Sequence, residues 1–294
     1  LNLKERCMES KKIYYHYCSV ETFFNIMQTS TLRLGNPLSM NDYSEVIWFL
    51  KLIKNYADKK WIYQNISEKW FLIESIIKDI TQEIEFPYIL CLSKKNDVLS
   101  QWRSYADDGK GVAIGINVDN LLKFSNLLSG NEIIYEPQKQ IEIINNKNID
   151  GFLDEIEREF LNNNIKNLHN KVRTLISHLL TEAVVCKNPK FQEEDEYRIL
   201  CNPVDFNPEE RKISRVKFRT NNECILPYRE IYFNKIKYSL IENITIGPKS
   251  LLNDRNLWLF LKNQGFKWLS EDGKWSKQDK KWKEHVKISK ATYR

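Results

Sequence analysis

Several residue types that mark particular protein classes are scarce in this sequence of 294 residues. It contains only nine Gly, eight Pro and four His, and no Ser/Gly/Pro-rich linker interrupts it. We therefore expect a single domain over residues 1–294. The six Cys lie far apart and form no CxxC pair, so with so few His we expect neither a disulfide framework nor a metal.

Long hydrophobic runs are also absent. The longest apolar stretches, such as residues 46–50 and 88–92, are too short to cross a bilayer. Residues 1–12 are charged and lack the apolar segment of a secretion signal. These features predict a cytoplasmic protein without a membrane partner.

Three catalytic or nucleotide-binding motifs are missing from the chain. There is no GxGxxG, no GxxxxGK[ST] and no GxSxG. A Rossmann dinucleotide site, a phosphate-binding P-loop and a hydrolase nucleophile elbow are therefore not predicted.

The basic excess of the sequence is modest, with a net charge of +6, but it is concentrated near one end. Between residues 267 and 290, lysines alternate with Trp268, Trp275 and Trp282. This pattern has two interpretations. The segment binds nucleic acid through phosphate contacts and base stacking, or its tryptophans anchor it to the core. We favour anchoring, because Trp side chains usually bury most of their area.

The order of predicted elements favours an α+β fold. Residues 11–17 and 31–34 read as strands, whereas residues 45–84 have the apolar spacing of two helices. Residues 150–187 look mostly helical and are interpreted as an insertion. After Pro189, short β-like runs separated by turns predict antiparallel strands with flanking helices.

The most suggestive motif is FQEEDEYRI, residues 191–199. As a strand, it would place Glu194, Glu196 and Arg198 on one face. Closely spaced carboxylates raise one another's pKa unless a cation compensates, and such pairs often mark working sites. An exposed Glu/Arg ladder is the equally supported alternative.

Two further places carry candidate binding residues. The run from Ser100 to Gly115 combines Trp102, Arg103 and Tyr105, which offer aromatic faces and a cation for a flat heterocycle and a diphosphate. His16 lies in a predicted strand, where its ring can meet a ribose hydroxyl or be an ordinary packed residue.

The loop NDYSE, residues 41–45, contains two more acidic residues. Asp42 and Glu45 are suited to binding a divalent ion or to capping the next helix. We favour capping.

Six segments together resemble a bacterial family called domain of unknown function 2971. In chain order they are YYHYCSVETFFNIMQTSTLRL, the NDYSE loop, CLSKKNDVLSQWRSYADDGKGVAIGI, FQEEDEYRI, ITIGP and VKISKATYR. The likeness extends over nearly the whole chain, but this family's name implies no activity.

A His-bearing first strand, a central aromatic residue and a late acidic strand are similar to the His-Tyr-Glu arrangement of ADP-ribosyltransferases. This resemblance implies a split β-sheet and NAD as the bound substrate. It assigns ribose hydroxyls to His16, the nicotinamide ring to Tyr105 and the catalytic carboxylate to Glu196. Glu194 then matches an acceptor-orienting position, and Tyr88 is an alternative to Tyr105.

Other residues complete the NAD site that the resemblance implies. Arg33 or Arg103 would hold the diphosphate, and Trp102 would add an aromatic face. The implied activity is ADP-ribose transfer to a macromolecular acceptor of unknown kind, or NAD hydrolysis, in a toxin or anti-phage effector.

Two alternatives belong to other classes of protein. The first is a nucleic-acid-binding protein or metal-dependent nuclease that uses Glu194, Glu196 and Asp97 with the basic segment near residues 267–290. The second is a catalytically silent binding module.

Overall fold

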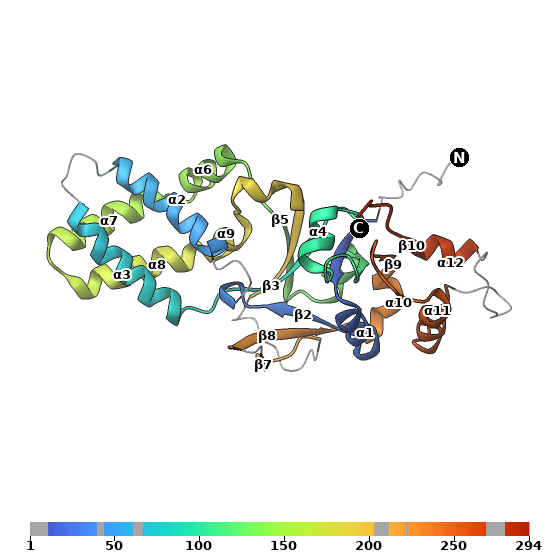
Figure 1. The fold of residues 1–294 in the computed structure, drawn as a ribbon. Coiled ribbons are helices and arrows are strands. Elements are labelled where there is room, and N and C mark those ends of the chain that lie inside the picture. Colours follow the sequence, from blue (N-terminus) through green and yellow to red (C-terminus); the bar gives the residue numbers. More distant parts are fainter. Residues whose placement is uncertain are drawn as a thin grey trace, which may run out of the picture.

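The computed structural model describes residues 11–39, 44–60, 67–202, 212–220, 223–268 and 280–293. Of the predicted site residues, Asp42 and the side chain of Glu45 lie outside this description, as does Trp275. Helices gather at one end of the molecule and a sheet occupies its middle (Figure 1). The fold is mixed α+β with a mostly antiparallel sheet, as the element order predicts.

Within the described residues, ten strands form the sheet, in the order β10-β9-β4-β1-β3-β2-β8-β7, with β6 paired to β3 and β5 paired to β6. Among the paired strands of the described residues, only β9 and β10 run parallel. The strands are β1 (Ile13–Cys18), β2 (Thr31–Gly35), β3 (Tyr88–Ser93), β4 (Val112–Asn117), β5 (Leu128–Glu132), β6 (Glu196–Cys201), β7 (Lys217–Thr220), β8 (Ile225–Tyr232), β9 (Ile241–Ile246) and β10 (Val286–Ile288).

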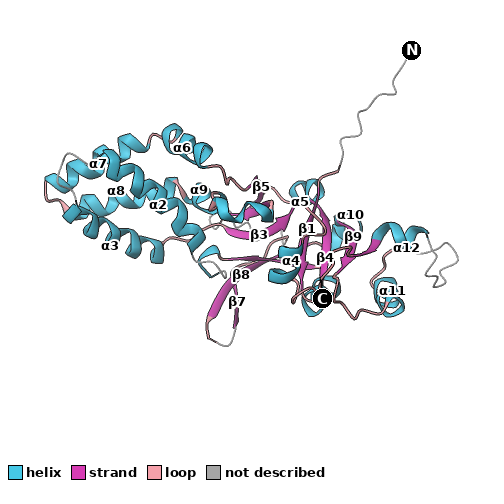
Figure 2. Cartoon of the chain, turned by 45° about the horizontal axis from the view of Figure 1, so that its top comes forward, coloured by secondary structure: helices cyan, strands magenta, loops and turns pink. Residues whose placement is uncertain are grey.

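Helices cover the sheet and extend beyond it (Figure 2). The α-helices are α1 (Val20–Thr29), α2 (Ser44–Lys60), α3 (Ser67–Glu83), α4 (Leu99–Tyr105), α5 (Val118–Phe124), α6 (Pro137–Asn146), α7 (Ile149–Leu161), α8 (Ile165–His178), α9 (Leu180–Val185), α10 (Lys237–Leu240), α11 (Asp254–Asn263) and α12 (Lys280–His285). The described part of the chain also contains the short 3-10 turns η1 (Pro37–Ser39), η2 (Pro189–Glu194) and η3 (Asn234–Ile236).

The sheet is split along one edge of β3. Both β1 and β2 pair with β3, but at different places: Tyr15 of β1 lies opposite Ser93, whereas Gly35 of β2 lies opposite Ile89. Strand β6 pairs along the whole length of β3. The two strands on the split edge therefore meet β3 near its opposite ends.

Local signals explain the first helix. Ser19 accepts a hydrogen bond from the backbone N–H of Thr22, so it is the N-cap that its position before an amphipathic stretch predicts. Phe23, Ile26 and Met27 are buried. This apolar face packs α1 against the sheet.

Buried apolar residues form two large clusters. One lies between the sheet and α1 and α11, and the other lies within the helical end and contains residues of α2, α3, α7 and α8. Trp268 and Trp282 belong to the first cluster, with 7% and 3% of their surface exposed. Anchoring is thus the correct interpretation for these two tryptophans.

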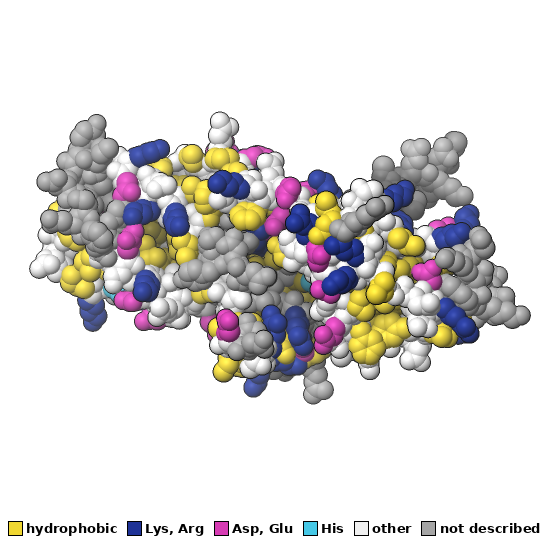
Figure 3. Space-filling model, viewed as in Figure 1, with side chains coloured by type: hydrophobic (Ala, Val, Ile, Leu, Met, Phe, Trp, Pro, Cys, Tyr) yellow, Lys and Arg dark blue, Asp and Glu magenta, His cyan; other side chains and the backbone are white. Residues whose placement is uncertain are grey.

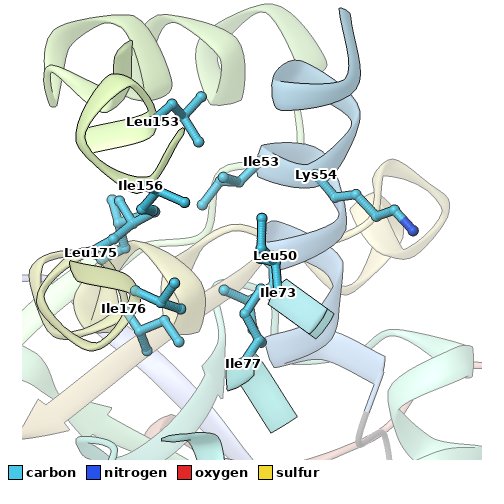
Figure 4. A pocket seen from close by; sticks show the side chains of 11 residues that line it. Leu50, Ile53, Lys54, Ile73, Ile77, Leu153, Ile156, Leu175 and Ile176 are labelled. Carbon is cyan, nitrogen blue, oxygen red and sulfur yellow. The ribbon is translucent and has the colours of Figure 1, made fainter. Parts of the chain in front are cut away.

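A small apolar cavity of about 30 Å³ lies between the helices of the helical end (Figure 4). Leu50 and Ile53 of α2, Ile73 and Ile77 of α3 and Leu153 of α7 are among its lining residues. A cavity of this size has room for about one water molecule and none for a nucleotide. It is a packing feature of the second cluster.

Within the described residues, no helix has the length and apolar character needed to cross a membrane.

Candidate functional site

A cluster of four charged side chains lies at the start of β6. We call Lys187, Glu194, Glu196 and Arg198 the charge cluster. Arg198 donates two hydrogen bonds to Glu196, from Nε to Oε1 at 2.7 Å and from Nη2 to Oε2 at 3.0 Å. Lys187 Nζ lies 2.5 Å from Glu194 Oε2 and 3.2 Å from Glu196 Oε2. One ammonium group thus joins the two carboxylates.

The cluster is largely shielded from water. The side chains of Lys187, Glu196 and Arg198 are 3%, 7% and 2% exposed, whereas that of Glu194 is 14% exposed. Charges this far from water require partners, and the two carboxylates here are matched by two cations. Glu194 is the most exposed of the four.

The local backbone explains how both carboxylates reach Lys187. The prediction of one strand over residues 191–199 is wrong in its first half, because residues Pro189–Glu194 form the 3-10 turn η2. Asp195 follows in the left-handed region with φ 44°, and β6 begins at Glu196. The turn brings Glu194 back beside the start of the strand, instead of two positions along it.

Strand alternation does place Glu196 and Arg198 on one face. Their partners on β3 are Ser93 and Cys91, respectively. This face is buried, so the alternative of an exposed Glu/Arg ladder is wrong.

Electrostatics keep Glu196 ionised. Burial by itself would raise the pKa of this carboxyl group, but the charges of Arg198 and Lys187 outweigh it and lower the pKa to about 2. The carboxylate is therefore fully charged at neutral pH. Within its own motif, the sequence offered Arg198 as the compensating cation; the structure adds Lys187.

Tyr105, the last residue of α4, completes the site at the surface. Its hydroxyl donates a hydrogen bond of 3.2 Å to Glu194 Oε1, and 44% of the residue is exposed. Partial burial and the charge of Glu194 raise the pKa of the phenol. The carboxylate of Glu194 is thus held on one oxygen by Lys187 and on the other by Tyr105.

His16 lies on the other face of the sheet. Tyr15 pairs with Ser93, which also pairs with Glu196, so these three side chains share one face and His16 points to the opposite one. His16 Nδ1 is 3.5 Å from the carbonyl oxygen of Cys91, beside the split edge of β3. Burial lowers the pKa of the imidazole. The structure does not bring His16 together with Glu194 and Glu196.

The predicted role of Trp102 as an exposed aromatic face is wrong. The residue is completely buried, its ring packs edge-on against Tyr17, and its Nε1 donates to Asp97 Oδ1 at 2.7 Å. Tyr88, the alternative to Tyr105, is likewise 2% exposed and lies in the first apolar cluster. Neither ring is available to a ligand.

The two arginines predicted to hold a diphosphate have aromatic partners outside the charge cluster. Arg33 on β2 is half-exposed, 3.7 Å from Glu230, and its guanidinium lies over the ring of Tyr228. Arg103 on α4 lies beside the ring of Tyr293. Of the two, Arg103 shares its helix with Tyr105.

Asp97, a ligand in the nuclease alternative, has other partners. Besides Trp102, it accepts hydrogen bonds from Ser289 Oγ at 2.5 Å and from the backbone N–H of Lys290 at 2.7 Å. Across the described part of the chain, no group of three or more His, Cys, Asp or Glu side chains is arranged to hold a metal ion.

Two residues of the site were missed by sequence reasoning. Lys187 bridges the carboxylates, and the hydroxyl of Tyr135 accepts a hydrogen bond of 3.2 Å from the backbone N–H of Glu196. Charge balance is a signal for the lysine: a buried pair of glutamates with one arginine requires a second cation. No sequence pattern indicates Tyr135.

The fold and the site thus define an α+β protein with a buried charge cluster at a split, mostly antiparallel sheet. The family model described as "Protein of unknown function (DUF2971)" matches residues 101–199, a segment that ends within β6 and contains the whole cluster. The chain is similar to that family over this segment. Searches of curated proteins and of solved structures found no match, and nothing in the comparisons supports the likeness to ADP-ribosyltransferases.

Proposed function

We propose that the protein is an enzyme that breaks the bond between nicotinamide and ribose in NAD, with Glu194 as the carboxylate that faces the reacting ribose. The observation that carries this proposal is the double fixation of Glu194, by Lys187 at 2.5 Å and by Tyr105 at 3.2 Å, at the solvent side of a buried charge cluster. A carboxylate held in this way is oriented before a substrate arrives.

The chemistry requires a fixed negative charge. When the C1′–N bond breaks, its electron pair leaves with nicotinamide and the ribose acquires oxocarbenium character. Glu194 stabilises that positive charge, and water or an acceptor group then forms the new bond at C1′ and releases a proton. With water, the product is free ADP-ribose; with an acceptor group, ADP-ribose becomes attached to a macromolecule. The biological role we propose is that of a toxin or anti-phage effector.

The geometry revises the role of Glu196. The side chain of Glu196 is only 7% exposed, against 14% for Glu194, and it accepts two hydrogen bonds from Arg198 and lies 3.2 Å from Lys187. In the proposed mechanism it is therefore the buried counter-ion that keeps Lys187 in place. Tyr105 is exposed enough to lie against the nicotinamide ring, as proposed from the sequence.

The surface around α4 suits a diphosphate. Lys and Arg side chains gather, with a few acidic ones, over the region where α4 lies in Figure 1, as Figure 3 shows. Arg103 and Lys110 are exposed there, and Lys95 has 60% of its side chain exposed. Positive charge at this place attracts the anionic substrate and supports the proposed role of Arg103.

The test is direct. Purified protein is incubated with NAD, alone and with protein or nucleic-acid acceptors, while nicotinamide release is followed by chromatography and NAD binding by calorimetry. We expect release above the spontaneous rate together with saturable binding. Absence of both with every acceptor would overturn the proposal.

A further inference from the structure

The position of Tyr105 depends on how its helix is held. Helix α4 has only seven residues, Leu99–Tyr105. It lies far from the charge cluster in the sequence and contacts it through the hydroxyl of Tyr105. A short helix gains little stability from its own hydrogen bonds. Contacts elsewhere on α4 must therefore fix where the phenol lies.

Asp97 is at the centre of those contacts. It lies just before α4, and its carboxylate accepts three hydrogen bonds: from Trp102 Nε1 at 2.7 Å, from Ser289 Oγ at 2.5 Å and from the backbone N–H of Lys290 at 2.7 Å. Trp102 is the fully buried residue of the helix. Asp97 thus ties the buried side of α4 to a segment almost two hundred positions away in the chain.

We call residues 289–293 the C-terminal strap. Ser289 donates its N–H to Ile246 O at 2.8 Å, which fixes the start of the strap to β9, and Ala291 packs beside the aromatic cluster of Trp102. At its other end, Tyr293 donates to Asp108 Oδ1 at 2.5 Å. The strap therefore crosses α4 and is attached on both sides of it.

The loop directly after Tyr105 is held by the same residues. Asp107 and Asp108 have positive φ, which costs free energy for residues other than Gly and persists only when the surroundings compensate it. Lys249 helps to hold this loop, because its Nζ lies 2.9 Å from Asp108 and 3.7 Å from the centre of the Tyr293 ring. Both ends of α4 are thus fixed through the strap.

We infer that Asp97 is a positioning residue for Tyr105. By joining Trp102 to the C-terminal strap, it holds α4 where the hydroxyl of Tyr105 can reach Glu194. Asp97 has no contact with Glu194 in the described structure, so it acts only through the helix. The consequence for catalysis rests on the proposed function, whereas the consequence for the Tyr105–Glu194 contact does not.

The test uses Asp97→Asn. The amide keeps one acceptor oxygen, but its NH₂ group now faces at least one of the three donors that the carboxylate accepted from, namely Trp102, Ser289 and the N–H of Lys290. Tyrosine labelled with ¹³C at Cζ reports the titration of each phenol by NMR, and Tyr105→Phe assigns the signal. In the wild type, Tyr105 should titrate well above the usual value of about 10. In Asp97→Asn we expect the midpoint of Tyr105 to fall toward 10, while that of Tyr135, which is not on α4, stays in place.

Two further variants sharpen the result. Ser289→Ala removes one of the three donors and should move the Tyr105 midpoint in the same direction but less, which keeps the test valid if Asp97→Asn folds poorly. Asp107→Asn is the matched control, because Asn also tolerates its left-handed backbone, and it should leave Tyr105 unchanged. For nicotinamide release, Asp97→Asn with Tyr105→Phe should lose no more activity than Tyr105→Phe alone.

The outcomes separate the two proposals. A moved Tyr105 titration without nicotinamide release by any form of the protein supports the positioning role and contradicts the proposed function. An unmoved Tyr105 titration in Asp97→Asn and in Ser289→Ala, together with a lower unfolding temperature, overturns the inference and makes Asp97 a purely stabilising residue.

Discussion

Arg198 holds the carboxylate of Glu196 through two hydrogen bonds, at 2.7 and 3.0 Å, with both side chains almost completely buried. A third bond of 2.6 Å from Arg198 Nη1 to the carbonyl oxygen of Val184 ties the pair to the end of α9. The paired ions thus join the first strand residue of β6 to the helical end of the molecule.

Removing the guanidinium should therefore be costly. In Arg198→Met, Glu196 keeps only Lys187 as a cationic partner, and breaking such a buried pair typically costs about 3–5 kcal/mol. Urea unfolding measures this loss. The matched control is Arg173→Met, since Arg173 pairs with Glu83 at the surface and should cost less than about 1 kcal/mol. Equal losses for the two variants would contradict the buried pairing.

Stability should also depend on pH through Glu196. Its pKa is about 2 in the folded protein against an ordinary value of 4.5, so the folded state binds the proton more weakly than the unfolded state. The resulting stabilisation, about 3 kcal/mol, is complete above pH 4.5 and is lost as the pH falls toward 2.

Urea unfolding between pH 6 and pH 2.5 tests this dependence. We expect Glu196→Gln to flatten the profile in its acid part, whereas Glu193→Gln, at an exposed neighbouring position, should reproduce the wild-type profile. A wild-type slope that persists in Glu196→Gln would show that other carboxylates cause it.

Gly115 on β4 leaves room for the side chain of Asn243 on the neighbouring strand β9. A Cβ at this position would lie 2.6 Å from Asn243 Oδ1 on β9. Gly115→Ala should therefore destabilise the protein by about 1–3 kcal/mol. Asn243→Ala in the same chain should restore most of this loss, measured by thermal unfolding.

Gly111→Ala is the control for that rescue. Its Cβ would lie 2.1 Å from the backbone carbonyl oxygen of Cys18, which no side-chain substitution removes. The Gly111→Ala variant should therefore stay destabilised when Asn243→Ala is added. Failure of Asn243→Ala to rescue Gly115→Ala would place the strain elsewhere.

The sequence predicted the elements with strong local signals. Alternation and capping placed β2 and the N-cap of α1, because Thr31–Gly35 alternate and Ser19 precedes an amphipathic stretch. Local patterns did not reveal β5, since Leu128–Glu132 contain polar and Gly residues that become a strand only beside β6. Pairing between distant segments decided that element.

The candidate site was likewise predicted only where local sequence encodes it. The proximity of Glu194 and Glu196 is encoded in one short motif, although a turn rather than a strand produces it. The contact of Tyr105 with Glu194 joins segments 89 positions apart and follows from the fold, as does the bridge by Lys187. The face on which His16 lies depends on the strand register at Tyr15, which periodicity alone does not specify.

The measurement that tests the central claim most directly is the rate of nicotinamide release from NAD by Glu194→Gln. The substitution removes the charge that the proposed mechanism needs and preserves the size of the side chain at a partly exposed position. We expect a loss of at least about a hundredfold in rate, as for removal of a transition-state electrostatic contact, with calorimetry still detecting NAD binding. Glu193→Gln, the exposed neighbour, should keep the wild-type rate. Release by Glu194→Gln at the wild-type rate would contradict the account.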